Sequence, residues 1–271
     1  MRKFLAIVLA AITLLVMFTG CSKKEQEQET RKANPASDFE YEVMGTDEKY
    51  VTIKKYIGKN TDVIIPEEIE KLPVKCIYYT AFAKTDIELV DIPDSVVRIF
   101  EYAFYSCQKL HTVKMGNGVE EVYRYAFQNC ISLENLTLSK KLARVETAAF
   151  SGCSSLTELH IPKSLNKWYG EAFYGNSLTK LTFEDGIENI GGYATLWDRE
   201  TALKEVTFPA SVKKLGEWTF GGGVEHAYFL GDAPEFGNKP FGESQVTIHY
   251  KKGTKGWDST GLEEWYTLVE D

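Results

Sequence analysis

The sequence has few of the residues that metal and redox sites require, since its 271 residues include only four His and five Cys. It also lacks an excess of positive charge, because 31 Lys and Arg face 39 Asp and Glu, a net charge of −8. A negative field repels phosphates, so we expect no nucleic-acid partner. Only one long hydrophobic run is present, which excludes a polytopic membrane protein.

Aromatic residues are abundant instead, with 15 Tyr, 15 Phe and 5 Trp making up 13% of the chain. The hydrophobic share of 44% and the charged share of 26% are ordinary for a folded globular protein. Disordered chains combine few hydrophobic residues with high net charge, so disorder of the whole chain is excluded. Large aromatic side chains bury much surface, and we therefore expect a substantial core.

The single hydrophobic run lies near the first residue. Two basic residues precede fifteen uncharged ones, 4–18, which is shorter than the roughly 20 residues that a membrane-spanning helix needs. This pattern is typical of a secretory signal peptide. The run ends in Thr19-Gly20-Cys21, which resembles the lipobox of bacterial lipoproteins, with Phe18 in place of the usual Leu. The resemblance implies a lipoprotein signal peptide over residues 1–21 and lipidation of Cys21, which would anchor the protein outside the cytoplasm on a bacterial membrane or cell surface.

The next segment, residues 22–37, contains no large hydrophobic side chain. Such a segment cannot bury enough surface to offset the entropy lost on ordering, so we predict a flexible tether. Its length corresponds to a span of roughly 22 Å, enough to hold a domain clear of lipid head groups.

An internal repeat of about 23 residues occupies most of the remaining sequence. Its clearest marker is an Ala-Phe pair at spacings of 22, 23, 23 and 23 residues: 81–82, 103–104, 126–127, 149–150 and 172–173. The first half of each unit alternates hydrophobic and polar residues, which predicts a half-buried strand. The second half places hydrophobic residues three and four apart, which predicts short helical or 3-10 turns. One such unit cannot bury both halves, so the copies must stack into a solenoid.

These units resemble the BspA-type leucine-rich repeats of bacterial cell-surface proteins. The resemblance rests on the pattern Val96-x-x-Ile99-x-x-x-Ala103-Phe104-x-x-Cys107-x-x-Leu110-x-x-Val113 and three further copies. It implies a leucine-rich-repeat solenoid of stacked parallel strands, used for adhesion or interaction and without catalytic residues. We therefore expect a non-enzymatic surface lipoprotein that binds proteins or glycans on a host or neighbouring cell. The alternative is a carbohydrate-capturing accessory lipoprotein that serves a neighbouring hydrolase or importer.

The repeats are predicted to cover residues 60–241 in about eight turns. Residues 38–59 alternate in two runs around Gly45-Thr46-Asp47, which predicts a β-hairpin as N-terminal cap. Residues 242–271 hold another alternating run and several aromatics, which predicts a C-terminal cap of β-structure and aromatic side chains.

The repeat cysteines and the histidines give no chemical site. Cys107, Cys130 and Cys153 fall in one column without the paired C-x-x-C spacing of zinc sites, and their parallel Cβ directions disfavour disulfides. We predict that they bond to the backbone of the turns. His160 and His226 lie three turns apart, roughly 15 Å at strand spacing, too far to share a metal. We therefore expect no metal, no cofactor and no catalytic set.

The outward strand positions form two polar columns. The first contains Leu89, Thr112, Asn135, Glu158, Lys180, Glu205 and His226; the second contains Asp91, Lys114, Thr137, His160, Thr182, Thr207 and Tyr228. Opposite charges on neighbouring turns, as in Asp91 with Lys114 and Glu158 with Lys180, are expected to pair.

Two interpretations of this face stay open: a merely solvated sheet, or a shallow surface for a protein or glycan. For the second, the predicted partner-binding residues are Lys114, Thr137, His160, Thr182, Thr207, Asn135, Glu158 and Lys180. Tyr and Trp are enriched at interfaces and stack on sugars, so the exposed aromatics are a further candidate surface. That set is Tyr78, Tyr79, Tyr102, Tyr105, Tyr123, Tyr125, Trp168, Tyr169 and Tyr174.

Overall fold

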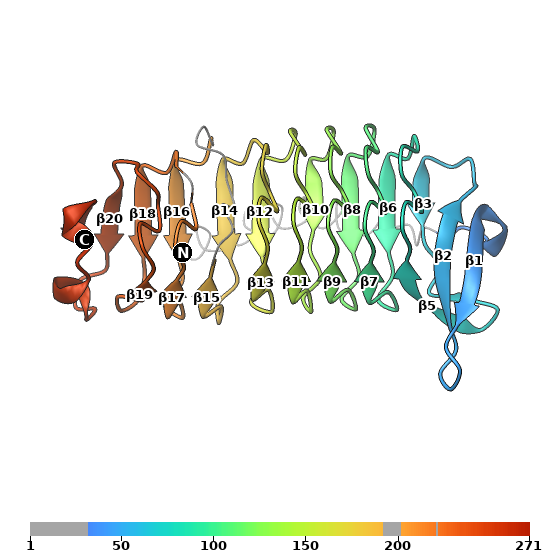
Figure 1. The fold of residues 1–271 in the computed structure, drawn as a ribbon, viewed down its shortest axis with the longest axis horizontal. Helices are drawn as coiled ribbons and strands as arrows, with labels where there is room; N and C mark the ends of the chain where they lie inside the picture. Colours follow the sequence, from blue (N-terminus) through green and yellow to red (C-terminus); the bar gives the residue numbers. More distant parts are fainter. Residues whose placement is uncertain (1–31, 192–201, 221) are drawn as a thin grey trace, which may run out of the picture. The chain divides into compact units, whose positions relative to one another are not determined.

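The chain winds into a parallel-strand solenoid of about nine turns, one more than the sequence predicts (Figure 1). The structure is a computed structural model, and it describes residues 32–191, 202–220 and 222–271. The predicted signal peptide, the lipidation site Cys21 and tether residues 22–31 lie outside the described residues, as do 192–201 and 221 of the predicted repeats.

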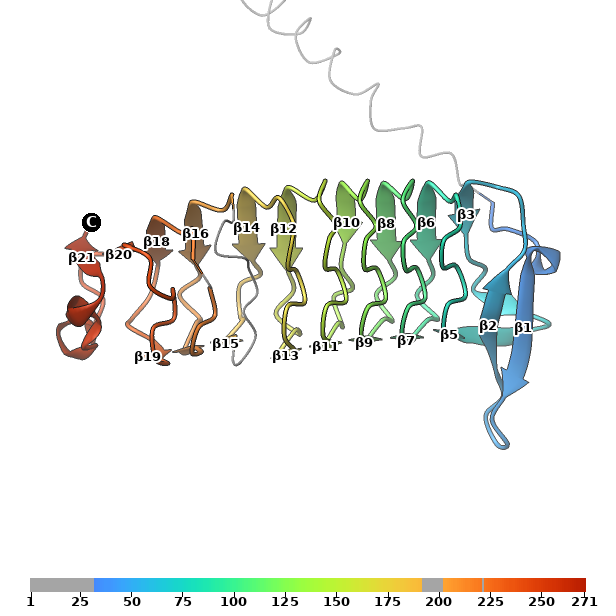
Figure 2. The same ribbon diagram turned by 45° about the horizontal axis from the view of Figure 1, so that its top comes forward.

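Each turn contributes a first strand of three or four residues, and these strands lie side by side in one row, the first row (Figures 1 and 2). The row is formed by β3 (Asp62–Ile64), β6 (Leu89–Ile92), β8 (Thr112–Met115), β10 (Asn135–Thr137), β12 (Glu158–Ile161), β14 (Lys180–Phe183), β16 (Glu205–Phe208), β18 (His226–Phe229), β20 (Thr247–Tyr250) and β21 (Thr267–Glu270). It divides into three hydrogen-bonded sheets, β3-β6-β8-β10, β12-β14 and β16-β18-β20-β21.

The second half of each turn contains another strand, usually of two residues, in a second row. This row is formed by β5 (Leu72–Ile77), β7 (Arg98–Ile99), β9 (Glu121–Val122), β11 (Arg144–Val145), β13 (Lys167–Trp168), β15 (Asn189–Ile190), β17 (Lys214–Leu215) and β19 (Glu235–Phe236). Pairing is parallel in both rows, and only the hairpins β1–β2 and β4 (Glu68–Ile69) with β5 are antiparallel among the described residues.

A second-row strand such as β7 leads into a tight turn of the kind that the hydrophobic spacing predicts, with 3-10-type hydrogen bonds such as that from Cys107 N–H to the Phe104 carbonyl at 3.2 Å. Val96, Ile99 and Ala103 are fully buried, as expected from their spacing. The backbone N–H of Phe104, however, donates to the carbonyl of Ala126 in the next turn at 2.7 Å, not to a carbonyl one helical turn back. Backbone groups are thus satisfied both within a turn and between neighbouring turns, and the only regular helices in the described ranges are three short 3-10 segments at the ends of the solenoid.

A column of phenylalanine rings forms the centre of the core. The rings of Phe82, Phe104, Phe127, Phe150 and Phe173 are fully buried and stack with centroid distances of 4.7, 4.7, 5.1 and 5.3 Å. The small Ala before each Phe is buried too and lets adjacent turns approach closely. The phenylalanine rings therefore fill the space between successive turns.

The cysteines form a second internal column. The thiols of Cys107, Cys130 and Cys153 are buried and free, and each donates to a carbonyl of the preceding turn, at 3.0, 3.2 and 3.3 Å. This is the backbone-bonding role predicted for them. Burial raises the pKa of the Cys153 thiol to about 12, so this thiol is protonated at neutral pH.

The N-terminal end is closed by the predicted hairpin. β1 (Phe39–Met44) pairs antiparallel with β2 (Tyr50–Tyr56), and β2 continues in parallel to β5. The chain is held in place ahead of this hairpin, because Asn34 is buried and its side-chain oxygen accepts the backbone N–H of Ile64 at 2.8 Å. The last residues of the segment predicted as tether are therefore packed on the first turn.

The C-terminal end is closed by aromatic side chains and one further strand. Trp257, in the 3-10 helix η2 (Trp257–Ser259), is buried and stacks on Tyr250 at 4.8 Å. The next 3-10 helix, η3 (Leu262–Glu264), leads to Trp265, which is 41% exposed and so does not contribute to the plug as the sequence suggested. Across the part of the chain that the structure describes, no helix is both long and hydrophobic enough to cross a membrane.

Candidate functional site

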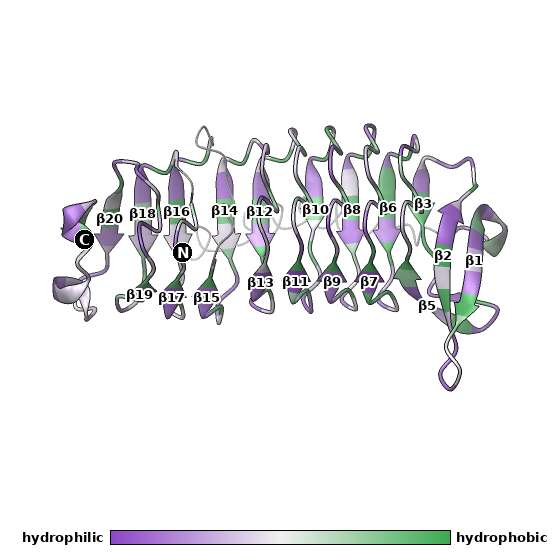
Figure 3. Ribbon diagram, viewed as in Figure 1, coloured by the Kyte–Doolittle hydropathy of each residue, from purple (hydrophilic) through white to green (hydrophobic). Residues whose placement is uncertain are grey.

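The register of the first-row strands places the predicted residues in the expected columns. Thr137 lies opposite Lys114, His160 opposite Thr182, and Glu158 opposite Lys180. Their side chains point outward, because the alternate positions of the same strands, such as Leu159 and Leu181, are buried. Figure 3 shows how the row varies: β6 is hydrophobic over most of its length, whereas β18 begins with hydrophilic residues.

A hollow of about 390 Å³ opens on this face where the strand ladder is interrupted. β10 and β12 are neighbours in the stack but belong to different sheets. Because no ladder joins them, Leu136 of β10 is only half-buried, whereas Val113 in the preceding strand is fully buried. The hollow brings together six of the eight predicted partner-binding residues: Asn135, Thr137, Glu158, His160, Lys180 and Thr182.

We refer to this feature as the strand-face hollow. A second depression of about 320 Å³ adjoins it and shares Leu136, Thr137 and His160 with it. The edge of that depression carries Glu184, whose pKa lies below its ordinary value because it accepts the backbone N–H of Lys163 at 3.0 Å. The two depressions form one uneven surface across β10, β12 and β14, and the second is largely apolar because Leu136, Leu138 and Pro162 line it.

The side chains around the strand-face hollow are ordered by mutual contacts. His160 Nδ1 lies 2.9 Å from Thr182 Oγ1, and Lys180 Nζ donates to Glu158 Oε2 at 2.9 Å. The predicted pairing of Glu158 with Lys180 is thus confirmed. The predicted pairing of Asp91 with Lys114 is wrong: their strand positions are opposite, but no ion pair joins them in the described structure.

Two predicted residues lie outside the hollow. Lys114 is one strand away, beside Thr137, and its side chain is exposed. Thr207 belongs to β16, which is in the next sheet along the row. The residues that do meet offer hydroxyls, an imidazole, a carboxylate and an ammonium group, so the surface can donate and accept hydrogen bonds.

A histidine pair near the C-terminal end is a contact that the sequence did not reveal. His226 Nδ1 lies 3.1 Å from His249 Nε2, and His249 Nδ1 lies 3.1 Å from Asp271 Oδ2. The His249 ring also stacks on Tyr228 at 4.5 Å. His249 follows in the second outward column, so extending that column by one turn would have found it. Among the described residues, no group of three or more His, Cys, Asp or Glu is arranged to hold a metal ion.

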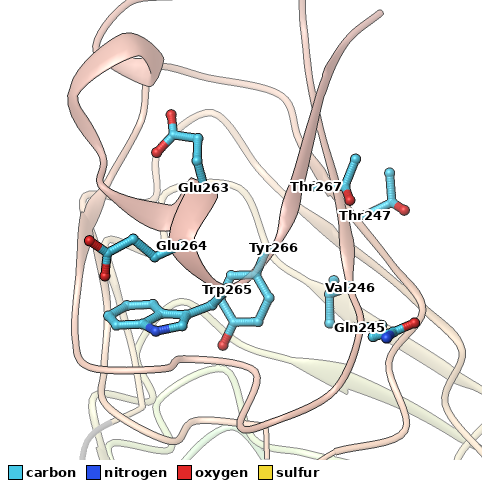
Figure 4. Close-up of a pocket in the computed structure, with 8 residues that line it drawn as sticks. All are labelled: Gln245, Val246, Thr247, Glu263, Glu264, Trp265, Tyr266 and Thr267. Atoms are coloured by element: carbon cyan, nitrogen blue, oxygen red, sulfur yellow. The ribbon is translucent and has the colours of Figure 1, made fainter.

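A hollow at the C-terminal end has a volume of about 510 Å³ and lies between the start of β20 and η3 (Figure 4). Glu263 and Glu264 extend to the side opposite Thr247, and the Trp265 indole is also on that outer side (Figure 4). The Tyr266 hydroxyl is occupied within the cap, since it donates to the Gly242 carbonyl at 3.0 Å. The Tyr266 hydroxyl of this hollow is therefore engaged by the cap itself.

The structure divides the aromatic residues that the sequence proposed as a further surface. Trp168 is buried and belongs to the core. Tyr78, Tyr79, Tyr169 and Tyr174 are between 40% and 53% exposed. The others, Tyr102, Tyr105, Tyr123 and Tyr125, are half-buried.

Comparison with known proteins agrees with this architecture. Residues 75–196 match the family model described as "BspA type Leucine rich repeat region", in six copies. No curated protein matches the chain. A leucine-rich repeat protein of T. pallidum has a similar solved structure, with 26% identity and a TM-score of 0.56, covering 76% of this chain and 86% of that one.

Two further solved structures are more distant. A leucine-rich repeat protein from Bacteroides ovatus is 19% identical with a TM-score of 0.49, covering 86% of this chain and 75% of that one. A leucine-rich cell surface protein from Faecalibacterium prausnitzii is 16% identical with a TM-score of 0.34, covering 85% and 97% of the two chains. From the repeat motif, the stacked turns and the family match together, we conclude that residues 75–196 consist of BspA-type leucine-rich repeats.

Proposed function

We propose that this chain is a non-enzymatic, extracytoplasmic binding protein that holds a protein or glycan on a host or neighbouring cell. The observation that supports this most directly is the strand-face hollow, where Asn135, Thr137, His160 and their neighbours meet at the break between β10 and β12. Such a surface suits adhesion and interaction, the activities that the family resemblance implies.

The lining favours an extended partner over a compact metabolite. Pockets for small molecules are mostly apolar with a few polar groups, whereas seven of the nine residues that line the strand-face hollow are polar. Strand positions repeat at about 4.8 Å, so several turns can present related groups to one long ligand. The contacts His160–Thr182 and Glu158–Lys180 hold these side chains in place before binding.

A triple variant tests the location of the site. Replacing Thr137, His160 and Thr182 with Glu should abolish binding of the labelled chain to intact cells, because three carboxylates would fill the strand-face hollow and make it negatively charged. The matched control replaces the exposed, neutral Asn166, Asn189 and Asn238 with Glu, adding the same charge elsewhere. Retained binding by a folded triple variant would contradict this location.

The proposed lipid anchor needs its own experiment, because Cys21 lies outside the described residues. We expect Cys21→Ser to leave the protein unprocessed or to release it from the membrane fraction, and to abolish labelling by a radioactive fatty acid. A processed, membrane-bound and still acylated variant would refute the anchor. Binding of a defined oligosaccharide at the strand-face hollow would favour the alternative role of a carbohydrate-capturing accessory protein.

A further inference from the structure

A second concave surface lies beyond the ends of β5, β7 and β9, away from the strand-face hollow. We name it the aromatic groove. It has a volume of about 660 Å³, and four tyrosines, one phenylalanine and two charged residues line it: Tyr78, Tyr79, Tyr102, Tyr125, Phe100, Glu101 and Arg124. It shares no residue with the strand-face hollow, so its function can be tested separately.

The aromatic groove is built by the repeat itself. In two successive turns a charged residue stands between two aromatic ones, as Phe100-Glu101-Tyr102 and Tyr123-Arg124-Tyr125. Stacking of the turns aligns these triplets into two aromatic ridges: Phe100 stacks on Tyr123 at 5.0 Å, and Tyr102 stacks on Tyr125 at 4.9 Å. Tyr79 approaches Tyr102 edge to face at 5.6 Å and is 53% exposed, so the groove has an accessible ring at its N-terminal end.

The backbone does not explain why large rings stand in one of these ridges. Tyr102 and Tyr125 have φ values of +57° and +61°, in the left-handed region that bulky residues rarely adopt. The same position is left-handed in other turns, where Thr80, Ala148 and Glu171 occupy it. The repeat backbone therefore does not require an aromatic ring there, and the rings of Tyr102 and Tyr125 are a feature of these two turns.

The polar groups of the aromatic groove are available to a ligand. No hydrogen bond within the described structure engages the hydroxyls of Tyr79, Tyr102 or Tyr125. Loss of solvation, with the neighbouring Tyr125 and Tyr79, raises the pKa of Tyr102, so its hydroxyl keeps its proton and can donate. Glu101 offers an acceptor and Arg124 offers donors, since they are paired only loosely at 3.8 Å.

Charges around the aromatic groove balance. Glu101 faces Arg124, and Lys54 lies 3.5 Å above the Tyr78 ring and pairs with Glu42 at 3.4 Å. Arg144 lies 6.0 Å from the centre of the Tyr123 ring and pairs with Glu146 at 2.6 Å. A site of this kind has no net attraction for an anionic or a cationic polymer.

We propose that the aromatic groove binds a neutral oligosaccharide. The C–H faces of pyranose rings pack on tyrosine rings, and their hydroxyls both donate and accept, which matches Glu101, Arg124 and the free tyrosine hydroxyls. Proline-rich peptides also bind aromatic-lined grooves. Proline has no backbone N–H, however, so such a peptide supplies few donors for Glu101.

Calorimetric titration of the purified full chain with cellohexaose, xylohexaose and mannohexaose tests this proposal, with a proline-rich dodecapeptide as the competing ligand. We expect at least one hexasaccharide to bind. Tyr102→Gly should weaken that binding about tenfold or more, as loss of a central aromatic contact does. The same variant should keep or raise thermal stability, because glycine adopts the positive φ without strain.

Two further variants complete the experiment. Tyr79→Ala removes an exposed ring of the aromatic groove and should also weaken binding, whatever the stability of Tyr102→Gly. Tyr169→Ala removes a 43%-exposed ring outside the groove and should leave affinity unchanged. Three results would each overturn the proposal. They are failure of all three hexasaccharides to bind, hexasaccharide binding that neither groove variant weakens, and binding of the peptide instead that depends on Tyr102.

Discussion

The inward and the outward columns of the solenoid use the same turn spacing in opposite ways. Inside, the same residue returns in turn after turn, as Phe82, Phe104, Phe127, Phe150 and Phe173 do with no exposure at all. Outside, the first strand column changes at every step, from Thr112 through Asn135 to Glu158 and Lys180. Repetition therefore builds the scaffold, because the buried rings of this column each meet a copy of themselves. Binding surfaces arise where the outward side chains differ from turn to turn.

Truncation of one ring in the inward column should have the largest effect of the changes proposed below. Phe127→Ala leaves a cavity between Phe104 and Phe150, which stack on it at 4.7 and 5.1 Å. Large-to-small changes of this kind cost about 3–5 kcal/mol. Urea denaturation measures the loss, and the exposed Tyr79→Ala should cost below about 1 kcal/mol. Equal losses for the two variants would remove the distinction between inward and outward columns.

A turn glycine gives the next largest effect. A Cβ added to Gly118 would lie 1.8 Å from the Asp94 carbonyl oxygen and 2.9 Å from that of Val96, so the backbone of the preceding turn would have to move. Gly118→Ala should therefore cost about 1–3 kcal/mol, the usual range for overpacking. Gly170→Ala is the control, because a Cβ there meets nothing within 4 Å. A Gly118 variant as stable as the control would mean that adjacent turns are not in close contact here.

Alkaline pH sharpens the comparison at the cysteine column. The Cys153 pKa is raised from 9.0 to about 12 by burial, so between these values the unfolded chain loses this proton while the folded chain keeps it. The folded state then binds more protons than the unfolded state, and stability falls as pH rises. Below pH 9 the protonated Cys153 thiol makes its full contribution to the stability of the folded state.

Cys153→Ser isolates this effect, because a hydroxyl retains a donor for the Phe127 carbonyl without titrating in this range. Between pH 9 and pH 12 the wild-type chain should lose stability relative to the variant by at most about 1.4 kcal/mol per pH unit. Urea titrations at pH 7, 9, 10 and 11 measure the difference. A constant difference across that range would show that the thiol is not held protonated by burial.

Much of the fold follows from the sequence alone, for a physical reason. The alternation that ends in Ile161-Pro162 predicts a strand that begins near Glu158, and the Ala-Phe phase predicts the ring column, because both depend only on which side chains are buried. The second-row strands were not predicted. Hydrophobic spacings of three and four fit a helical turn as well as a strand followed by a tight corner, and only hydrogen bonds to the neighbouring turn decide between them.

The candidate sites were predictable to different degrees. The outward columns follow from strand alternation, so the sequence predicts most residues of the strand-face hollow. The sequence does not predict the break between β10 and β12, because no residue type there marks the missing hydrogen-bond ladder. The contact of His249 with Asp271 depends on the path of the C-terminal cap, which lies outside the 23-residue period. The aromatic groove needed ring orientations that a sequence does not contain.

The outward ion pair of Glu158 and Lys180 should give the smallest effect on stability. Their atoms meet at 2.9 Å, yet both side chains are more than half exposed, at 65% and 60%. Water and salt screen such a pair, and exposed pairs contribute about 0.2–1 kcal/mol. A double-mutant cycle with Glu158→Ala and Lys180→Ala, measured at 0.05 and 0.5 M salt, gives the coupling energy, which should be smaller at high salt.

Binding to cells should fall in both single variants although stability barely changes, because these residues contribute to partner binding and hardly at all to the stability of the fold. A coupling energy well above 1 kcal/mol would instead mean that this pair stabilises the fold. Its charges would then not be free to bind a partner in the strand-face hollow.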